Sequence, residues 1–358
     1  MSAGDLLAST IKAIGALDEA AMASAGARQG QLTKPAGSLG RLEELSVQLA
    51  GVQGKALPNI ERKAVIVMAA DHGVTAEGVS AYPADVTGQM VANFLAGGAG
   101  INVLARQIGA RIVIVDMGVA VDIPAHPQLI SRKVARGTAN MARGPAMTEA
   151  QAITALETGI AVLASEADRG LDIVGTGDMG IGNTTASSAI CAAFTGKTAA
   201  EVTGRGTGVD DAQLKHKAEV IDWALKLNRP DPKRPLSVLA GVGGFEIGGL
   251  AGVMLGAGAR RIPVVVDGFI SGAAAMVATA LAPKLSGFLI AGHVSAEAGH
   301  RLMLEHLKLR PLVDLGMRLG EGTGAAIGIF LCETATKVLS EMATFGEAGV
   351  SERSGPAA

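Results

Sequence analysis

Aromatic side chains are scarce in this chain of 358 residues: they make up 3% of it, with one Trp (Trp223) and one Tyr (Tyr82). Proteins that stack the bases of single-stranded nucleic acids need such side chains. The chain also has no basic tract, and its formal net charge is −2. We therefore expect no nucleic-acid partner. The core must be built from aliphatic residues and Met.

Cysteine and long apolar runs are also lacking. The two cysteines, Cys191 and Cys332, lie in apolar stretches and are expected to be buried thiols, as suits a cytoplasmic protein. A charge-free stretch at residues 179–196 contains Asn, Thr and Ser side chains. A membrane span needs about 20 mostly apolar residues, so no membrane insertion is expected. The charges at Asp5 and Lys12 argue against a secretory signal.

Short, wholly apolar runs recur from residue 63 onward, and most are separated by enough residues for a helix. Strands buried on both faces of a parallel sheet have this uniform composition. The pattern predicts an α/β fold with a Rossmann-like, mostly parallel sheet flanked by helices. The predicted strands are residues 64–70, 111–115, 171–174, 236–240, 262–266 and 288–291.

The two ends of the chain have helical periodicity instead. Leucines and isoleucines recur at helical spacing between residues 6 and 52, and an apolar helix is expected from Ala325 to Cys332. We therefore expect two domains. Residues 1–60 and about 325–358 would form a small helical domain, and residues 61–324 the α/β domain.

Glycine-rich segments with polar side chains follow the predicted strands. The clearest, GTGDMGIGNTT at residues 175–185, lies between a predicted strand and a predicted helix. Glycine lets backbone amides approach a phosphate, and a helix N-terminus adds free N–H groups and a positive dipole end. Ligands of such sheets bind beyond the carboxyl ends of the strands. The segments predict one site for a small anion, with a ligand-free tight turn as the alternative.

Glu321 is the strongest candidate for a general base. It lies between glycines in LGEGTG, directly before an apolar helix. Partial burial there would raise its pKa toward a useful range. Alternatively, Glu321 only complements the helix dipole. Asp178 is a second candidate acid, with the alternative that it bonds the backbone of its own glycine loop.

Lys217 follows the segment GRGTGVDD at residues 204–211 and could reach a phosphate. The alternative is a solvated helix face. Three histidines, His72, His293 and His300, are scattered without the spacing of metal ligands. We therefore expect no metal and no cofactor.

Over about residues 30–345 the chain resembles the nicotinate-nucleotide–dimethylbenzimidazole phosphoribosyltransferase family. The resemblance rests on nine motifs in order. They are KPAGSLGRLE (34–43), ADHGVTAEGVSAYP (70–83), VTGQMVANFLAGGAGINVLAR (86–106), GTGDMGIGNTT (175–185), GRGTGVDD (204–211), GGFEIGGLAG (243–252), DGFISGAAA (267–275), GHVSAEAGH (292–300) and LGMRLGEGTGAA (315–326).

The resemblance implies a reaction between two small molecules. The 5-phosphoribosyl group of nicotinate mononucleotide would pass to 5,6-dimethylbenzimidazole. The products would be nicotinate and α-ribazole 5′-phosphate, with inversion at C1′. This step belongs to assembly of the nucleotide loop of cobalamin. The resemblance also implies a homodimer.

The resemblance further implies roles for individual residues. Glu321 matches the catalytic base, and Asp178, where some members have Glu, a supporting acid. The implied phosphate-binding residues are Gly180, Gly182, Asn183, Thr184, Gly206, Lys217 and Ser295. The implied base-binding residues are Ser80, Tyr82, Gln89, Met179 and Leu319.

Two other functions compete with this one. An NAD-linked oxidoreductase would need GxGxxG in the first strand-to-helix turn, where this chain has Asp71-His-Gly73. A non-catalytic nucleotide-binding regulator would share the phosphate loops without needing Glu321. The acceptor base used in the cell stays open, since an apolar pocket discriminates by only about 1–3 kcal/mol per methyl group.

Overall fold

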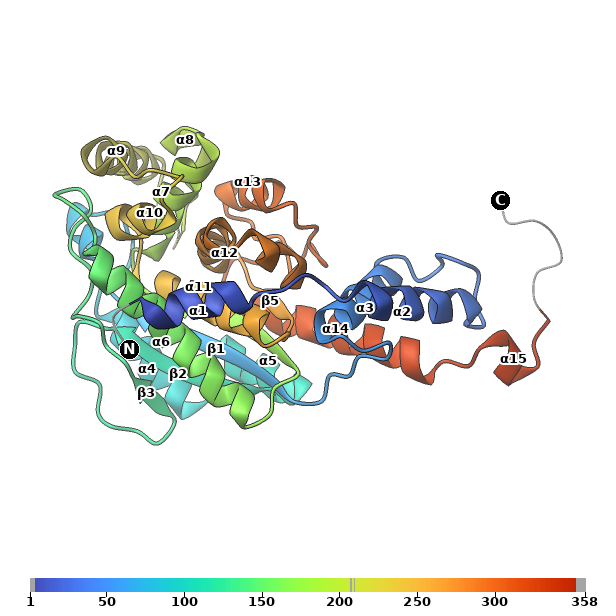
Figure 1. Ribbon diagram of the computed structural model, residues 1–358. Coiled ribbons are helices and arrows are strands. Elements are labelled where there is room, and N and C mark those ends of the chain that lie inside the picture. The colour runs from blue at the N-terminus through green and yellow to red at the C-terminus, as the bar shows by residue number, and fades with distance from the viewer. Residues whose placement is uncertain (1–3, 207, 209, 352–358) are drawn as a thin grey trace.

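A six-stranded, all-parallel sheet forms the centre of the computed structural model, which describes residues 4–206, 208 and 210–351 (Figure 1). The strand order is β3-β2-β1-β4-β5-β6, so the chain changes direction across the sheet between β1 and β4. This confirms the predicted α/β fold. The strands are β1 (Lys63–Ala70), β2 (Arg111–Gly118), β3 (Leu129–Ser131), β4 (Ile173–Met179), β5 (Val264–Val266) and β6 (Leu289–Ala291).

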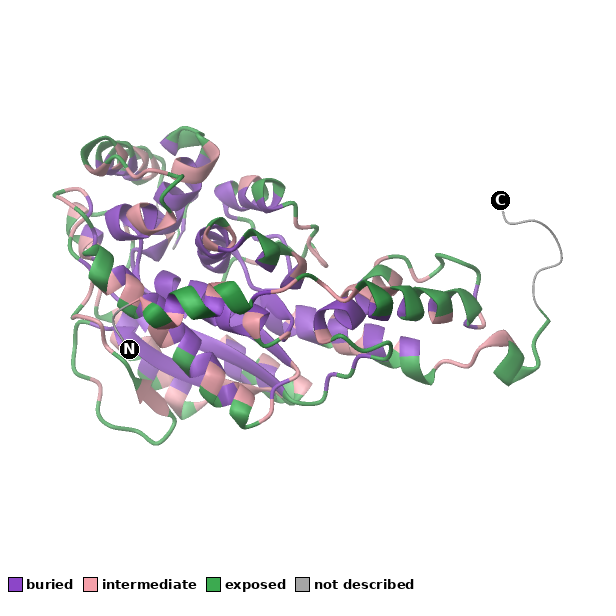
Figure 2. Ribbon diagram, viewed as in Figure 1, coloured by how far each residue is buried: buried purple, intermediate pink, exposed green. Residues whose placement is uncertain are grey.

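Helices flank the sheet, and the central strands are buried beneath them (Figure 2). None of the helices within the described ranges is long and apolar enough to cross a membrane. They are α1 (Asp5–Ala13), α2 (Glu19–Gln31), α3 (Arg41–Gln53), η1 (Gly73–Glu77), α4 (Val86–Ala96), α5 (Gly100–Ile108), α6 (Glu149–Asp168), α7 (Asn183–Thr195), α8 (Ala199–Val202), α9 (Asp211–Asn228), α10 (Pro235–Val242), α11 (Phe245–Ala259), α12 (Phe269–Leu281), η2 (Pro283–Phe288), α13 (Ala298–Leu307), α14 (Thr323–Glu341) and α15 (Phe345–Ala348).

One predicted strand is wrong: residues 236–240 lie in helix α10. Pro235 occupies the first turn of that helix, where its missing N–H costs nothing. A helix buried on most sides is as uniformly apolar as a buried strand, and the run is too short for periodicity to separate the two. Strand β3 was missed because it is three residues long and only partly buried.

The predicted glycine loop at residues 175–185 is shorter in the structure. Strand β4 continues to Met179, so Gly175 and Gly177 lie in the strand. They are needed for packing, since a Cβ on Gly177 would lie 2.8 Å from the backbone nitrogen of Gly322, beside α14. Only Gly180 to Gly182 form the loop before α7.

Helix α14 connects two parts of the molecule. Its first half packs on β4, β5 and α5, and its second half packs against α2 and α3, which project from the sheet-containing body (Figure 1). Helix α1, however, contacts α6 and α11. The predicted division into two domains, whose boundaries include residues outside the described ranges, stays a prediction.

Helices α6 and α11 approach each other through glycines. A Cβ on Gly252 of α11 would overlap the carbonyl oxygen of Leu156 in α6 and would lie 3.1 Å from the Cα of Gly159. Such backbone contact leaves no room for a side chain, and Figure 2 shows α11 buried along its length.

We predict that Gly252→Ala lowers the free energy of unfolding by roughly 1–3 kcal/mol, because the added methyl forces the two helices apart. The control is Gly26→Ala in α2, where a Cβ would meet nothing within 4 Å. That change should raise stability by roughly 0.5–1 kcal/mol, since Ala favours helix. Urea unfolding measures both. Equal effects of the two substitutions would contradict the close packing of α6 and α11.

Candidate active site

A cavity of about 690 Å³ opens beyond the carboxyl ends of the parallel strands. This is where ligands bind in open α/β sheets, near the point where the strand order reverses. Besides Gly206, five segments contribute to its wall: residues 82–90, 178–184, 268–270, 293–297 and 318–321. Strand ends far apart in sequence therefore contribute to one cavity, but only three of the six predicted strand-end segments, those with Asp178, Gly268 and His293, reach its wall. The predicted segments at residues 71–73 and 116–118 lie outside the wall, as do residues 241–246, which join two helices.

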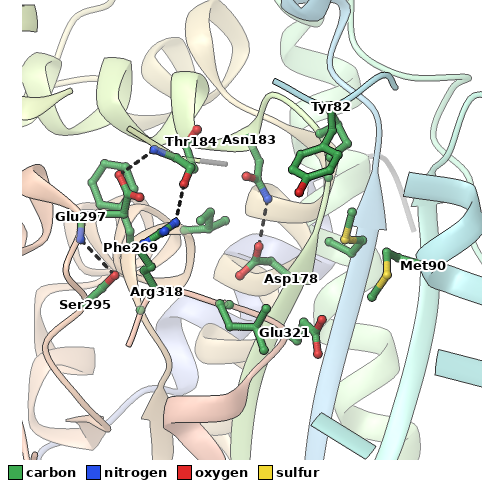
Figure 3. Close-up of a pocket in the computed structure, with 18 of the residues that line it drawn as sticks. Tyr82, Met90, Asp178, Asn183, Thr184, Phe269, Ser295, Glu297, Arg318 and Glu321 are labelled. Atoms are coloured by element: carbon green, nitrogen blue, oxygen red, sulfur yellow. Dashed lines mark hydrogen bonds between the residues drawn. The ribbon is translucent and has the colours of Figure 1, made fainter. Parts of the chain in front are cut away.

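The two ends of the cavity differ in chemistry (Figure 3). Thr184, Ser295, Glu297 and Arg318 gather at one end. Tyr82 and Met90 lie at the opposite end, and Asp178 and Glu321 lie between. One end suits a small anion and the other a flat apolar ring.

Glu321 is buried on the cavity wall, with 5% of its surface exposed. Its backbone has φ 62°, in the left-handed region that non-glycine residues rarely adopt. Its Oε2 accepts the N–H of Ile101 at 3.1 Å, at the N-terminus of α5. Burial raises the pKa of Glu321, as does the neighbouring Asp267, while backbone N–H groups oppose the shift. The carboxylate complements the dipole of α5, not that of the helix that follows it in the chain, and it faces the cavity; its role as a base stays a prediction.

Asp267, at the end of β5, caps helix α14 from outside. Its Oδ1 accepts the N–H groups of Gly324 at 2.6 Å and Ala325 at 3.1 Å, and its Oδ2 accepts that of Gly322 at 3.2 Å. Burial raises the pKa of Asp267, and His293 and these N–H donors oppose the rise. Sequence reasoning missed this role, since the capped helix begins more than 50 residues downstream.

Asp178 is also buried on the cavity wall, between acids of the same sign. Burial raises its pKa well above the usual range, and Asp267, Glu246 and Glu321 raise it further. Its one opposing contact is a hydrogen bond of 2.9 Å donated by Asn183 Nδ2. This shift favours the protonated form of the Asp178 carboxyl over the ionised form that a base requires.

A buried His–Glu pair supports the glycine loop from below. His72 Nε2 lies 2.5 Å from Glu246 Oε1, and both side chains are out of contact with solvent. A Cβ on Gly180 would lie 3.3 Å from that oxygen and 3.5 Å from the His72 ring. The His72–Glu246 pair therefore packs against the loop at Gly180 and supports its conformation. Sequence reasoning noted both residues without pairing them.

Lys217 is buried behind the anion-binding end of the cavity, so its predicted alternative of a solvated face is wrong. Its ammonium donates to Thr184 Oγ1 at 2.7 Å and to the carbonyl of Gly204 at 3.4 Å. Burial lowers the pKa of Lys217 to about 8, and the charge of Glu297 opposes this. Lys217 stays mostly protonated at neutral pH. Its positive charge lies directly behind Thr184, whose hydroxyl it contacts at the cavity wall.

Two helix N-termini face the cavity without a side-chain cap. Helix α7 begins after Gly182 and brings Asn183 and Thr184 to the wall. Helix α12 begins after Gly268, which lines the wall itself. Their N–H groups and dipoles favour an anion at this end.

The cavity wall brings together ten of the residues singled out from the sequence, although their roles remain predictions. They are Tyr82, Asp178, Met179, Gly180, Asn183, Thr184, Gly206, Ser295, Leu319 and Glu321. The remaining four lie outside the wall: Ser80, Gln89, Gly182 and Lys217. The wall also has residues that sequence reasoning did not assign to it, notably Phe269, Glu297 and Arg318. Glu297 follows Ser295 in a quoted motif, which was the available signal.

The histidines considered as metal ligands have other partners. His300 Nδ1 accepts the N–H of Ser295 at 2.7 Å, and burial lowers the pKa of His300 to about 3. His293 Nε2 lies 3.8 Å from Asp267 Oδ1. In the part of the chain that the structure describes, no group of three or more His, Cys, Asp or Glu side chains could hold a metal ion.

A family model described as a phosphoribosyltransferase (DBI_PRT) matches residues 14–350. The nicotinate-nucleotide–dimethylbenzimidazole phosphoribosyltransferase of Roseiflexus sp. (strain RS-1) is 64% identical over 97% of this chain and 98% of its own length. The protein of the same name from Chloroflexus aggregans is 60% identical over 97% and 99% of the two chains.

Solved structures agree with these relatives. A crystal structure of CobT from Thermus thermophilus superposes with a TM-score of 0.90 at 48% identity, covering 93% of this chain and all of that one. A second, of the nicotinate-nucleotide–dimethylbenzimidazole phosphoribosyltransferase from the same organism, has a TM-score of 0.89 at 46% identity and covers 94% of this chain. This chain therefore belongs to the nicotinate-nucleotide–dimethylbenzimidazole phosphoribosyltransferase family.

Proposed function

We propose that this cavity transfers the 5-phosphoribosyl group of nicotinate mononucleotide to 5,6-dimethylbenzimidazole. The products are nicotinate and α-ribazole 5′-phosphate, formed with inversion at C1′ for the nucleotide loop of cobalamin. The observation that carries the proposal is the position of Glu321. Its buried carboxylate lies between an apolar end, suited to a benzimidazole, and an anion-binding end, suited to a phosphate (Figure 3).

The chemistry needs alignment and one proton acceptor. Nicotinate is bound to the ribose as a pyridinium, so it leaves with the electron pair of the C1′–N bond and needs no metal or acid. A ring nitrogen of dimethylbenzimidazole attacks C1′ from the opposite face, and Glu321 takes the proton from its other nitrogen. Holding both rings about one sugar removes the entropy cost of bringing them together.

The anion-binding end supplies the contacts for the 5′-phosphate. The N-terminus of α7, the hydroxyls of Thr184 and Ser295 and the ammonium of Lys217 behind Thr184 all favour a bound anion. Burial and the neighbouring acids favour the protonated form of Asp178, which supports assigning it as a supporting acid and not as the base.

We infer further that the protein acts as a homodimer in the cytoplasm. Tyr82 and Leu319 line the cavity and are nevertheless 54% and 59% exposed. A second subunit covering them would enclose the base-binding end. The buried free thiols of Cys191 and Cys332 suit a reducing compartment. Sedimentation should give twice the mass of 35.9 kDa, and a monomer at micromolar concentration would contradict the dimer.

Replacing Glu321 by Gln should reduce kcat by roughly 10²- to 10⁴-fold, because the amide cannot take the benzimidazole proton. The measurement is release of nicotinate and formation of the riboside from the two substrates. Near-normal turnover by E321Q would show that Glu321 is not the base, while the proposed reaction itself would still stand. No turnover by the unaltered protein would instead remove the transferase proposal and favour a nucleotide-binding regulator.

As the pH is lowered, kcat at saturating substrates should begin to fall at a higher pH than it would if the base were a Glu with an ordinary pKa. A base works only when deprotonated, and burial raises the pKa of Glu321 above its usual value of about 4.3. The acid limb of kcat against pH should therefore have its midpoint above that value and disappear in the residual activity of E321Q. Activity must return when the pH is raised again, which excludes acid unfolding. A midpoint at or below the ordinary value would contradict this environment.

A further inference from the structure

Glu297 brings a carboxylate into the anion-binding end of the cavity. The side chain is on the wall and only 6% exposed. Its Oε2 accepts the N–H of Gly206 at 3.3 Å (Figure 3). A Cβ on Gly204 would overlap that oxygen, so glycine at that position leaves room for the carboxylate. An acid here is unexpected, because like charges repel and the proposed ligand group is a phosphate.

The charges around Glu297 are few. Lys217 lies behind Gly206, since a Cβ added to Gly206 would be 3.1 Å from Lys217 Nζ. Arg318 Nη1 donates to the carbonyl of Gly206 at 3.0 Å. His300 follows on α13, and burial lowers its pKa to about 3, so it stays neutral. His293 also lines the cavity. Lys217, Arg318 and Glu297 thus lie around Gly206, and the adjacent Arg205 is paired with Asp211.

A doubly charged phosphate ester does not fit beside this carboxylate without a proton. Ionised carboxylate and phosphate oxygens only accept hydrogen bonds, so two of them in a buried site repel each other. One proton between them turns the contact into a short, charge-assisted O–H···O⁻ hydrogen bond. The second pKa of a phosphate ester is about 6, so near neutral pH this proton must come from the solvent.

We propose that Glu297 and the 5′-phosphoryl group of the bound nucleotide share one proton that is taken up on binding. The inference rests on the proposed function, since it takes nicotinate mononucleotide as the ligand. The ligand dianion, the Glu297 carboxylate and one proton from water form the complex, and no covalent bond changes. Glu297 therefore selects a phosphate ester over a sulfate ester, which holds no proton near neutral pH.

A merely structural Glu297 would behave differently. If the carboxylate only held Gly206 and kept Lys217 charged, its removal would weaken binding of the nucleotide without changing how many protons accompany it. The number of protons taken up is therefore the deciding observation, and affinity alone is not.

The test is titration calorimetry of nicotinate mononucleotide at pH 7.0 in phosphate-free buffers of different ionisation enthalpy. The unaltered protein should take up close to one proton per nucleotide. Its affinity should fall nearly tenfold per pH unit above the phosphate pKa, as linkage requires for one proton. E297Q, whose amide can donate to the dianion, should take up almost none. Uptake by Lys217 or His293 would instead persist in E297Q.

The matched control is Ser295→Ala, which removes a hydroxyl from the same end of the cavity. It should weaken binding and leave the proton number unchanged. Equal proton uptake by E297Q and the unaltered protein, or no uptake by either while the nucleotide binds and turns over, overturns the role of Glu297 alone. Absence of both binding and turnover overturns the proposed function instead.

A second measurement needs no substitution. Inorganic phosphate and sulfate are compared as competitors of nicotinate mononucleotide at pH 7.0. Phosphate should bind at least tenfold more tightly than sulfate, with uptake of part of a proton, because some of the free inorganic phosphate is already the monoanion at this pH. Equal binding of the two anions without proton uptake would overturn the proposal even if E297Q failed to fold.

Discussion

The hydrogen bonds from the first turn of α14 to Asp267 determine the geometry of the whole site. They tie the end of β5 to the start of α14, and the turn just before that helix lies too close to β4 to allow a side chain at Gly177. They also hold the turn from Gly320 to Gly322, in which Glu321 adopts a positive φ. Water does not reach these N–H groups, so losing the carboxylate would leave them unsatisfied. The position of the proposed base is thus a consequence of how a helix is capped.

Four buried acids lie near one another, and their partners separate structural from chemical roles. Asp267 accepts three backbone N–H groups, and Glu246 is paired with His72. Both carboxylates have their partners within the fold, although burial still raises the pKa of Asp267. Glu321 accepts from the N-terminus of α5, Asp178 accepts from Asn183 Nδ2, and both face the cavity. Burial outweighs these weaker contacts and raises both pKa values, as is common for groups that move protons.

The sequence predicted the parallel sheet and the location of the site because both depend on local signals, namely apolar runs and the polar residues after them. It failed where the same composition serves two structures, as in the buried helix at residues 236–240. It could not place Gly177 in a strand, since the backbone that requires glycine there, at Glu321 and Gly322, lies far along the chain. The capping contacts of Asp267 were missed for the same reason, since they join distant segments and no spacing within one motif reveals them. Glu297, by contrast, lies in the same motif as Ser295 and could have been considered from it.

The capping of α14 also decides where an anion can bind. Three helices, α7, α12 and α14, begin at the cavity, and each N-terminus attracts negative charge. Asp267 already occupies that of α14, which lies beside Glu321, whereas those of α7 and α12 have no side-chain cap. The end with Thr184 is therefore the better site for the phosphate of the proposed substrate, away from the proposed base. In the proposed reaction, a ribose extending from that phosphate would bring C1′ toward the middle of the cavity, where Glu321 would take the proton of the attacking ring.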